Sequence, residues 1–225
     1  MTKILREFFK NIFSAVGLFS VMIFFTACSG EDSPEKALTE MQYSFEEKNF
    51  QQLLIRADLE KFFAQTYDDV TVELVKNCAE YGKKYPEDPY FQHDAEFLRK
   101  YNSEHRELHL KFLRDVATAY FEKLPEPETP EKNPHAYVAN EFEKIRLSSN
   151  AVIKDIQTDG NKSVMTIEMR GDDSIRGQFI GTLTFKISFS RDEKNFWRLN
   201  KIENLDELTP ILVDKAEMIW ITFYN

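Results

Sequence analysis

The sequence predicts an α+β fold in which helices pack on one face of a curved antiparallel β-meander. Apolar residues first recur at helical spacing, between Ser33 and Leu124. A proline-rich stretch follows, and beyond it apolar and polar residues alternate as they do in strands. Helices followed by strands, without regular alternation of the two, are typical of α+β domains. The chain is therefore expected to divide into a helical part, 28–124, a connector, 125–134, and a sheet part, 135–225.

The first 27 residues have the composition of an export signal. Basic residues at the start precede an uncharged run from Ile12 to Ala27, and Cys28 follows directly. A membrane-spanning helix needs about 20 predominantly apolar residues. Because this run is shorter and contains two serines and a glycine, we expect 1–27 to be removed as a signal peptide. A retained single-span anchor and export without lipidation are the two alternatives.

The segment Phe25-Thr26-Ala27-Cys28 resembles the lipobox of bacterial lipoproteins, although Phe25 stands where that motif usually has Leu. The resemblance implies that the Cys28 sulfur receives a diacylglycerol, that the new amino terminus is acylated, and that these lipids anchor the protein to a membrane. It places the protein in the cell membrane or the outer membrane, facing the periplasm or the exterior. In enteric bacteria, Ser29 would direct such a protein onward from the inner membrane.

The charge of the chain excludes one class of partner. The formal net charge is −9, and loss of 1–27, which holds three basic residues and one acidic residue, makes it −11. Such an acidic protein repels nucleic-acid phosphates, so we expect no nucleic-acid partner. The second cysteine, Cys78, falls on the apolar stripe of a predicted helix, which favours a buried, unreactive thiol.

The helices of the first part are expected in close succession. Ser33-Pro34-Glu35 provides the cap, the proline and the acidic first turn that begin a helix, only a few residues after Cys28. The next helices are expected at Phe50–Ala57, at Leu59–Tyr67, and from Asp69 to about Gly82. One long pattern then continues over Phe91–Leu124, and a kink near Asn102-Ser103 would divide it naturally.

Two histidines in this long pattern, His105 and His109, have the spacing at which two imidazoles can share a metal ion. A helical zinc protease needs Glu directly after the first His, and Arg106 stands there instead. The other two histidines, His93 and His135, do not suggest a third ligand. We therefore expect a hydrogen-bonded, partly buried pair, and no metal or other cofactor.

The connector and the sheet part follow. Residues 125–134 hold four prolines, so we expect a plain linker, with a polyproline ligand as the alternative. A short helix is expected near Tyr137–Ile145. The predicted strands are Val152–Ile156, Val164–Met169, Gln178–Ser190 and Phe196–Ile202, with an Asp159-Gly160 turn between the first two. From Thr209 we expect a helix, although the β-branched and aromatic residues near the end would also suit a strand.

Helices followed by a meander that ends in Trp197-Arg198-Leu199 and Asn204-Leu205-Asp206-Glu207-Leu208 resemble the nuclear transport factor 2-like superfamily, especially its uncharacterised lipoprotein members. The resemblance covers Ser33–Tyr67 and Ala151–Leu208. It implies a cone-shaped α+β domain, here with an enlarged helical segment. In this superfamily the sheet and helices enclose a pocket, in which the enzymes place an acidic residue, Tyr or His.

The predicted inner face of the sheet holds no side chain that can transfer a proton. Its inward positions are Phe179, Leu183, Phe185, Ile187, Phe189, Trp197 and Leu199. Glu168 and Asp155, on other strands, are the candidate bases of a pocket enzyme, an isomerase or hydrolase. We therefore expect no catalytic residues and a lipid-anchored envelope protein that binds or scaffolds another protein or a small apolar ligand. The alternatives are that enzyme, or an inhibitor or immunity lipoprotein that captures a basic partner through its charge.

Overall fold

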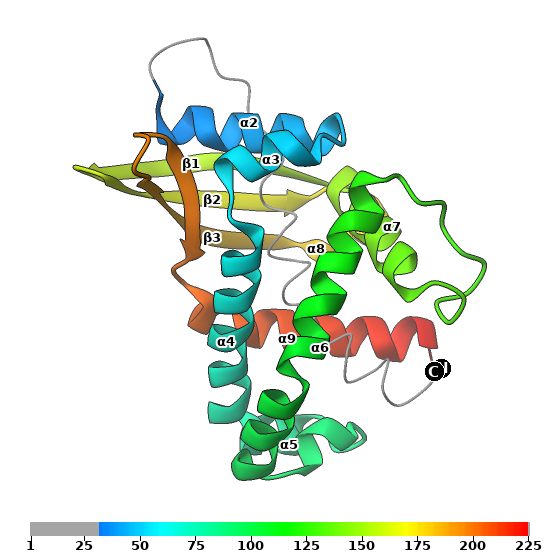
Figure 1. Cartoon of the computed structure of the whole chain (residues 1–225). Helices are drawn as coiled ribbons and strands as arrows, with labels where there is room; N and C mark the ends of the chain where they lie inside the picture. The colour runs from blue at the N-terminus through cyan, green and yellow to red at the C-terminus, as the bar shows by residue number, and fades with distance from the viewer. Residues whose placement is uncertain (1–31, 225) are drawn as a thin grey trace.

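The computed structural model describes residues 32–224, in which helices and one antiparallel sheet form an α+β fold (Figure 1). Its elements are α2 (Pro34–Glu46), α3 (Phe50–Arg56), α4 (Leu59–Lys76), α5 (Cys78–Lys84), the 3₁₀ helix η2 (Pro89–Gln92), α6 (Ala95–Phe121), α7 (Pro134–Leu147), β1 (Ser149–Asp159), β2 (Lys162–Gly171), α8 (Ile175–Ile180), β3 (Thr182–Arg191), β4 (Trp197–Ile202) and α9 (Leu205–Tyr224). The predicted fold class, helices packed on a β-meander, is confirmed. Within residues 32–224 no helix is both long and apolar enough to cross a bilayer.

The sheet is a meander with the order β1-β2-β3-β4, and each neighbouring pair is antiparallel. The predicted turn between the first two strands is present, and Gly160 has the positive φ of 55° that suits such a tight turn. Ile167 lies opposite Phe185, and Phe189 lies opposite Leu199. Alternate side chains of the three strands therefore meet on one face and build a continuous apolar surface.

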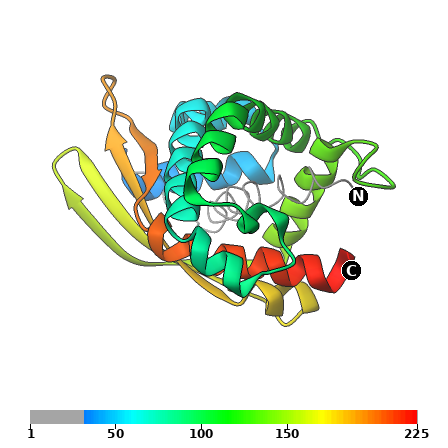
Figure 2. The same cartoon turned by 90° about the horizontal axis from the view of Figure 1, so that it is seen from below.

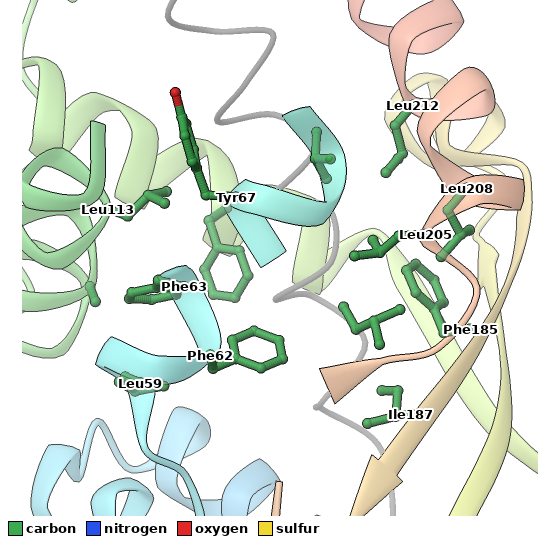
Figure 3. Close-up of a cluster of buried hydrophobic side chains, with 14 of the residues drawn as sticks. Leu59, Phe62, Phe63, Tyr67, Leu113, Phe185, Ile187, Leu205, Leu208 and Leu212 are labelled. Atoms are coloured by element: carbon green, nitrogen blue, oxygen red, sulfur yellow. The ribbon is translucent and has the colours of Figure 1, made fainter. Parts of the chain in front are cut away.

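The core lies between this apolar surface and α4. Phe62 of α4 points toward the sheet, where Phe185 and Ile187 are buried (Figure 3). Phe63, the next residue, points the other way, toward Leu113 of α6 (Figure 3). Helix α4 therefore packs against the sheet on one side and against α6 on the other.

The remaining helices lie on the same side of the sheet (Figure 2). Helices α2 and α3 pack against β4, where Ala57 forms a bridge with Leu199. Helix α9 packs against α4 and β3, and Leu205, Leu208 and Leu212 lie beside Phe185 (Figure 3). Helices α6 and α7 pack on each other. The opposite face of the sheet carries mostly polar side chains, such as Glu168, Thr184 and Lys186, together with the exposed Val152.

The structure differs from the prediction at two helix boundaries in the first part: the one predicted near Asp69 is absent, and one between Lys76 and Cys78 was not predicted. Helix α4 runs without interruption from Leu59 to Lys76, through the division predicted at Asp69. The apolar stripe continues from Tyr67 to Val70 and Leu74, with neither Gly nor Pro to end it. Cys78 is buried, as predicted, but it begins the separate helix α5.

Helix α6 runs from Ala95 to Phe121, and its hydrogen-bonded helical structure continues through Asn102-Ser103, the position of the predicted kink. Asn102 is buried and its side-chain amide donates to the Leu98 carbonyl oxygen one turn earlier, at 2.9 Å. Its polar group is therefore accommodated within the helix rather than breaking it.

The start of the third strand is also wrong. The sequence predicted a strand from Gln178, but residues 175–180 form α8, and β3 begins at Thr182 after Gly181, whose φ is 62°. The Ser174 hydroxyl caps α8 by accepting from the Gly177 backbone N–H, which is a local helix signal within an otherwise alternating pattern. Phe179 therefore belongs to a helix, and Ile180, predicted to face water, is buried. The other six inward positions of the sheet are buried as predicted, namely Leu183, Phe185, Ile187, Phe189, Trp197 and Leu199.

The connector and the carboxyl-terminal helix follow the prediction closely. Residues 125–133 form neither helix nor strand, and Pro134 is the first residue of α7. The last element is a helix, as predicted, but it begins at Leu205 and carries Pro210 inside it. The predicted signal peptide, 1–27, and the predicted lipidation site, Cys28, lie outside the described residues, as does Ser29.

Candidate functional site

The first described residue of the chain, Asp32, is held by two elements that are distant in sequence. One carboxylate oxygen accepts from Nη2 of Arg56, at the end of α3, at 2.6 Å. The other accepts from the backbone N–H of Trp197, at the start of β4, at 2.8 Å. The chain is therefore fixed to the folded domain four residues after Cys28. We call Asp32, Glu40, Arg56 and Trp197 the anchor junction.

Arg56 is the centre of the anchor junction, because each of its three side-chain nitrogens donates a hydrogen bond. Its side chain is 3% exposed, and Nε donates to Glu40 of α2 at 2.6 Å. Nη1 donates to the Trp197 carbonyl oxygen at 3.2 Å. A planar guanidinium matches this set of acceptors, whereas an ammonium group could not reach all of them. The junction thus connects α2, α3, β4 and the start of the domain.

The charges of the anchor junction are matched inside the protein. Burial alone raises the pKa of the Asp32 carboxyl, but hydrogen bonds from Arg56 and from the Trp197 backbone outweigh burial and lower that pKa overall. Asp32 therefore stays ionised at neutral pH. The sequence identified the short spacing after Cys28, but it held no signal that Asp32 pairs with a residue of α3.

A second feature is a row of rings along α6, which we call the α6 ring row. It consists of His93, Phe97, Tyr101, His105 and His109. His93 lies just before α6, and the four members within the helix are spaced four residues apart, which places them on one side of it. Successive ring centroids lie 3.9, 6.1, 4.2 and 6.0 Å apart, each pair stacked. Phe97, near the start of α6, is 44% exposed, and Leu108, which precedes His109 in the middle of the helix, is 57% exposed.

The other end of the ring row enters the interior. Nδ1 of His109 lies 2.9 Å from the Tyr67 hydroxyl, which also donates to the Asn102 carbonyl oxygen at 3.2 Å. Burial, with a smaller effect of His105, lowers the pKa of His109 to about 4, so its imidazole is neutral at physiological pH. The row therefore connects exposed rings to a buried polar pair. The spacing of His105 and His109 was recognisable in the sequence, and the same spacing of Phe97 and Tyr101 was the signal for the rest of the row.

The histidine pair occupies the positions expected from the sequence. The ring of His105 stacks on Tyr101, and its Nδ1 lies 2.8 Å from the Tyr101 carbonyl oxygen. Since Nδ1 of His109 faces Tyr67, these two nitrogens are directed at protein groups rather than at one shared point. Residues 32–224 contain no group of three side chains suited to hold a metal ion.

The two candidate bases of the enzyme alternative lie away from the apolar core. Glu168 is on the polar face of the sheet, where it pairs with Lys154 at 3.0 Å and Arg170 at 2.6 Å. The hydrogen bond from Lys154 is the main cause that lowers its pKa, whereas a general base working near neutral pH needs a raised one. Asp155 is exposed and accepts from Gln157 at 2.8 Å. Neither carboxylate therefore has the placement that a pocket enzyme requires.

A polar cluster that the sequence did not indicate joins the turn after α2 to α6 and α7. We call Lys48, Tyr120, Glu143 and Arg146 the Glu143 cluster. Glu143 accepts from Tyr120 at 2.6 Å, from Lys48 at 3.1 Å and from Arg146 through two bonds of 2.8 Å. These donors overcome the effect of burial and lower the pKa of Glu143 to about 2.

Within the same cluster, Lys48 is partly buried against an aromatic ring and has a lowered pKa. Its ammonium nitrogen lies 3.1 Å from the centroid of the Tyr120 ring, and Lys48 itself has a φ of 57°. Burial outweighs the attraction of Glu143, which is already paired with Arg146, and lowers the pKa of Lys48 to about 8. Lys48, Tyr120 and Arg146 all donate to Glu143, so the cluster connects the turn after α2 with α6 and α7.

Comparison with known proteins adds no relative. A scan against family models, a search of curated proteins and a search of solved structures each found no match to this chain.

Proposed function

We propose that this chain is a lipid-anchored envelope protein of a non-catalytic type, which binds or scaffolds a partner. The observation that supports the proposal most directly is the anchor junction. A chain that is to be held by lipids on Cys28 needs a firm attachment soon after that residue, and Asp32 provides one through Arg56 and Trp197. The short spacing between Cys28 and Asp32 would then place the folded domain directly beside its lipid anchor.

The energetics of such an anchor are favourable. A single acyl chain gives only marginal membrane binding, at about 0.8 kcal/mol per buried CH₂ group. The three chains that a bacterial lipoprotein normally carries would bind the protein firmly. With Asp32 fixed, the domain would stand directly on the membrane rather than at the end of a flexible tether.

The α6 ring row supports a binding role at the other end of the domain. Figure 1 shows the start of α6 beside α5, at the end of the molecule opposite α2. Phe97 and Leu108 are exposed on α6, and both are large apolar side chains. A domain standing on its α2 end would present these side chains away from the bilayer, to a protein or a small apolar ligand.

The anchor is tested by comparing the natural protein with Cys28→Ala after metabolic labelling with a clickable palmitate analogue and fractionation of the envelope. We expect label and membrane association for the natural protein and neither for Cys28→Ala. Cys78→Ala is the matched control, because its thiol is free and buried, and it should keep both properties. Equal labelling of the natural protein and Cys28→Ala would contradict the proposal.

The binding role is tested with a photo-crosslinking residue at position 97 or 108, and at Ile175 of α8 as the control. Ile175 is 76% exposed but lies on another element. We expect one discrete crosslinked species from the two α6 positions and none from α8. Equal crosslinking from all three positions would mean that the α6 ring row has no special role.

A further inference from the structure

The turn between β3 and β4, residues 191–196, lies directly beside the anchor junction. The Asp32 carboxylate holds the backbone N–H of Trp197, and the ring of Phe196 lies 5.5 Å from the Arg56 guanidinium carbon. Figure 1 shows the start of β4 next to the beginning of α2. The chain therefore enters the described domain at this turn.

The reach of the chain between Cys28 and Asp32 limits how far this turn can be from a lipid anchor. An extended chain spans at most about 3.3 to 3.6 Å per residue. Four residues therefore cover no more than roughly 14 Å. The headgroup region on each side of the hydrocarbon core is about 5 to 7 Å thick. With Cys28 held by lipids in the bilayer, the surface around Asp32 must lie at or near the headgroups.

The turn is well ordered by its own hydrogen bonds, so it presents a defined surface. One carboxylate oxygen of Asp192 accepts from the backbone N–H groups of Lys194 and Phe196, both at 2.9 Å. Nη1 of Arg191 donates to the Asn195 side chain at 2.6 Å, and Asn195 adopts a φ of 65°. The backbone that carries Phe196 is therefore fixed relative to the sheet.

The exposed surface of the turn suits a membrane interface. Phe196 is 42% exposed, and aromatic side chains are favoured where the apolar region of a bilayer meets water. Arg191 and Lys194 balance the charges of Asp192 and Glu193, so the turn adds no net charge. The chain without residues 1–27 carries −11 overall, and a locally neutral turn is repelled by lipid phosphates less than that overall charge would imply.

We propose that the β3–β4 turn contacts the bilayer beside the lipid anchor, with the Phe196 ring in the headgroup region, and thereby sets the orientation of the domain on the membrane. The inference rests on the proposed lipid anchor at Cys28. In this orientation the α6 ring row faces away from the membrane.

The test places a single environment-sensitive fluorophore on Phe196→Cys of the lipidated full-length protein, in a Cys78→Ser background, reconstituted into phosphatidylcholine vesicles. Ile175→Cys, labelled in the same way, is the control on an exposed position of α8. We expect a blue shift of emission at position 196, quenched by nitroxide lipids, and no shift at position 175. An unchanged emission at position 196 in protein that floats with the vesicles would overturn the proposal.

Two further outcomes are distinguishable from that one. A blue shift at position 196 that depends on protein concentration and persists without vesicles would mean that a second copy covers the turn, which also overturns the proposal. If the protein does not float with vesicles and Cys28 is unmodified by mass spectrometry, the proposed anchor fails, and the membrane contact fails with it.

Discussion

The Asp32 carboxylate and the Arg56 guanidinium lie 2.6 Å apart, and this ion pair joins the first described residue of the chain to the end of α3. Arg56 also binds Glu40 and the Trp197 carbonyl oxygen, so one buried side chain links four segments. Buried ion pairs are costly to break, because the partner that remains has lost its compensation. The start of the domain is therefore part of its folded structure.

Replacing Arg56 by Met should destabilise the protein by about 3 kcal/mol, because two carboxylates and a backbone carbonyl lose their donor. Chemical denaturation monitored by circular dichroism measures the change. Arg99→Met, on the exposed side of α6, is the control and should stay within about 0.5 kcal/mol of the natural protein. Equal stability of the two variants would mean that the anchor junction contributes nothing to folding.

The Glu143 cluster should make the stability depend on pH under acidic conditions. The pKa of Glu143 is lowered to about 2 in the folded protein, from an ordinary value of 4.5. The ionised carboxylate therefore stabilises the fold above pH 4.5, and this contribution is lost as the pH falls from about 4.5 to 2.

We expect Glu143→Gln to cost on the order of 2 kcal/mol at pH 7, and the difference from the natural protein to shrink between pH 5 and 3. Urea denaturation at several pH values measures it. Glu47→Gln, which removes an exposed carboxylate from the adjacent segment, is the control and should stay within about 0.5 kcal/mol of the natural protein at pH 7. A constant difference across this range would contradict the low pKa of Glu143.

His109 should destabilise the protein on mild acidification. Its pKa falls from 6.5 to about 4 on folding, because burial penalises the charged imidazole. The unfolded chain therefore binds more protons between these two values, and stability is lost as the pH falls from about 6.5 to 4. NMR titration of the imidazole signals checks this directly. A midpoint for His109 near 6.5 would show that the imidazole is not desolvated.

The fold class and the inner face of the sheet were predictable, because apolar residues such as Phe185, Ile187 and Phe189 alternate with polar residues, as they do in a strand with one buried face. The start of β3 was not, because Gln178 to Ile180 extend that alternation although they belong to α8. Two features determine that these residues form a helix: the Ser174 cap and the close packing of Gly171 against Gly177. The spacing of apolar residues reflects neither of them.

The candidate sites depended on contacts between distant segments, and this limited what the sequence could indicate. The partners of Asp32 are 24 and 165 residues away, and no local pattern connects them. The α6 ring row was partly predictable, because its members follow one helical spacing. The Glu143 cluster was not, because Lys48 and Glu143 are 95 residues apart and look like ordinary surface charges in the sequence.

Gly171, the last residue of β2, should tolerate no side chain. A Cβ atom on Gly171 would lie 1.7 Å from the Gly177 carbonyl oxygen, so the backbone of α8 would have to move. We expect Gly171→Ala to destabilise the protein by about 3 kcal/mol or more. Gly160→Ala is the comparison: there is open space around it, and its positive φ should cost only about 1 kcal/mol. Thermal unfolding that ranks the two variants in the reverse order would contradict the packing of α8 on β2.

The central claim is that lipids on Cys28 hold this domain on a membrane. The most direct measurement is mass spectrometry of the amino-terminal peptide from protein extracted from the envelope with detergent. The account predicts a peptide that begins at Cys28, with residues 1–27 absent and a diacylglycerol on the sulfur. A peptide with an unmodified thiol that is still joined to Ala27 would contradict it.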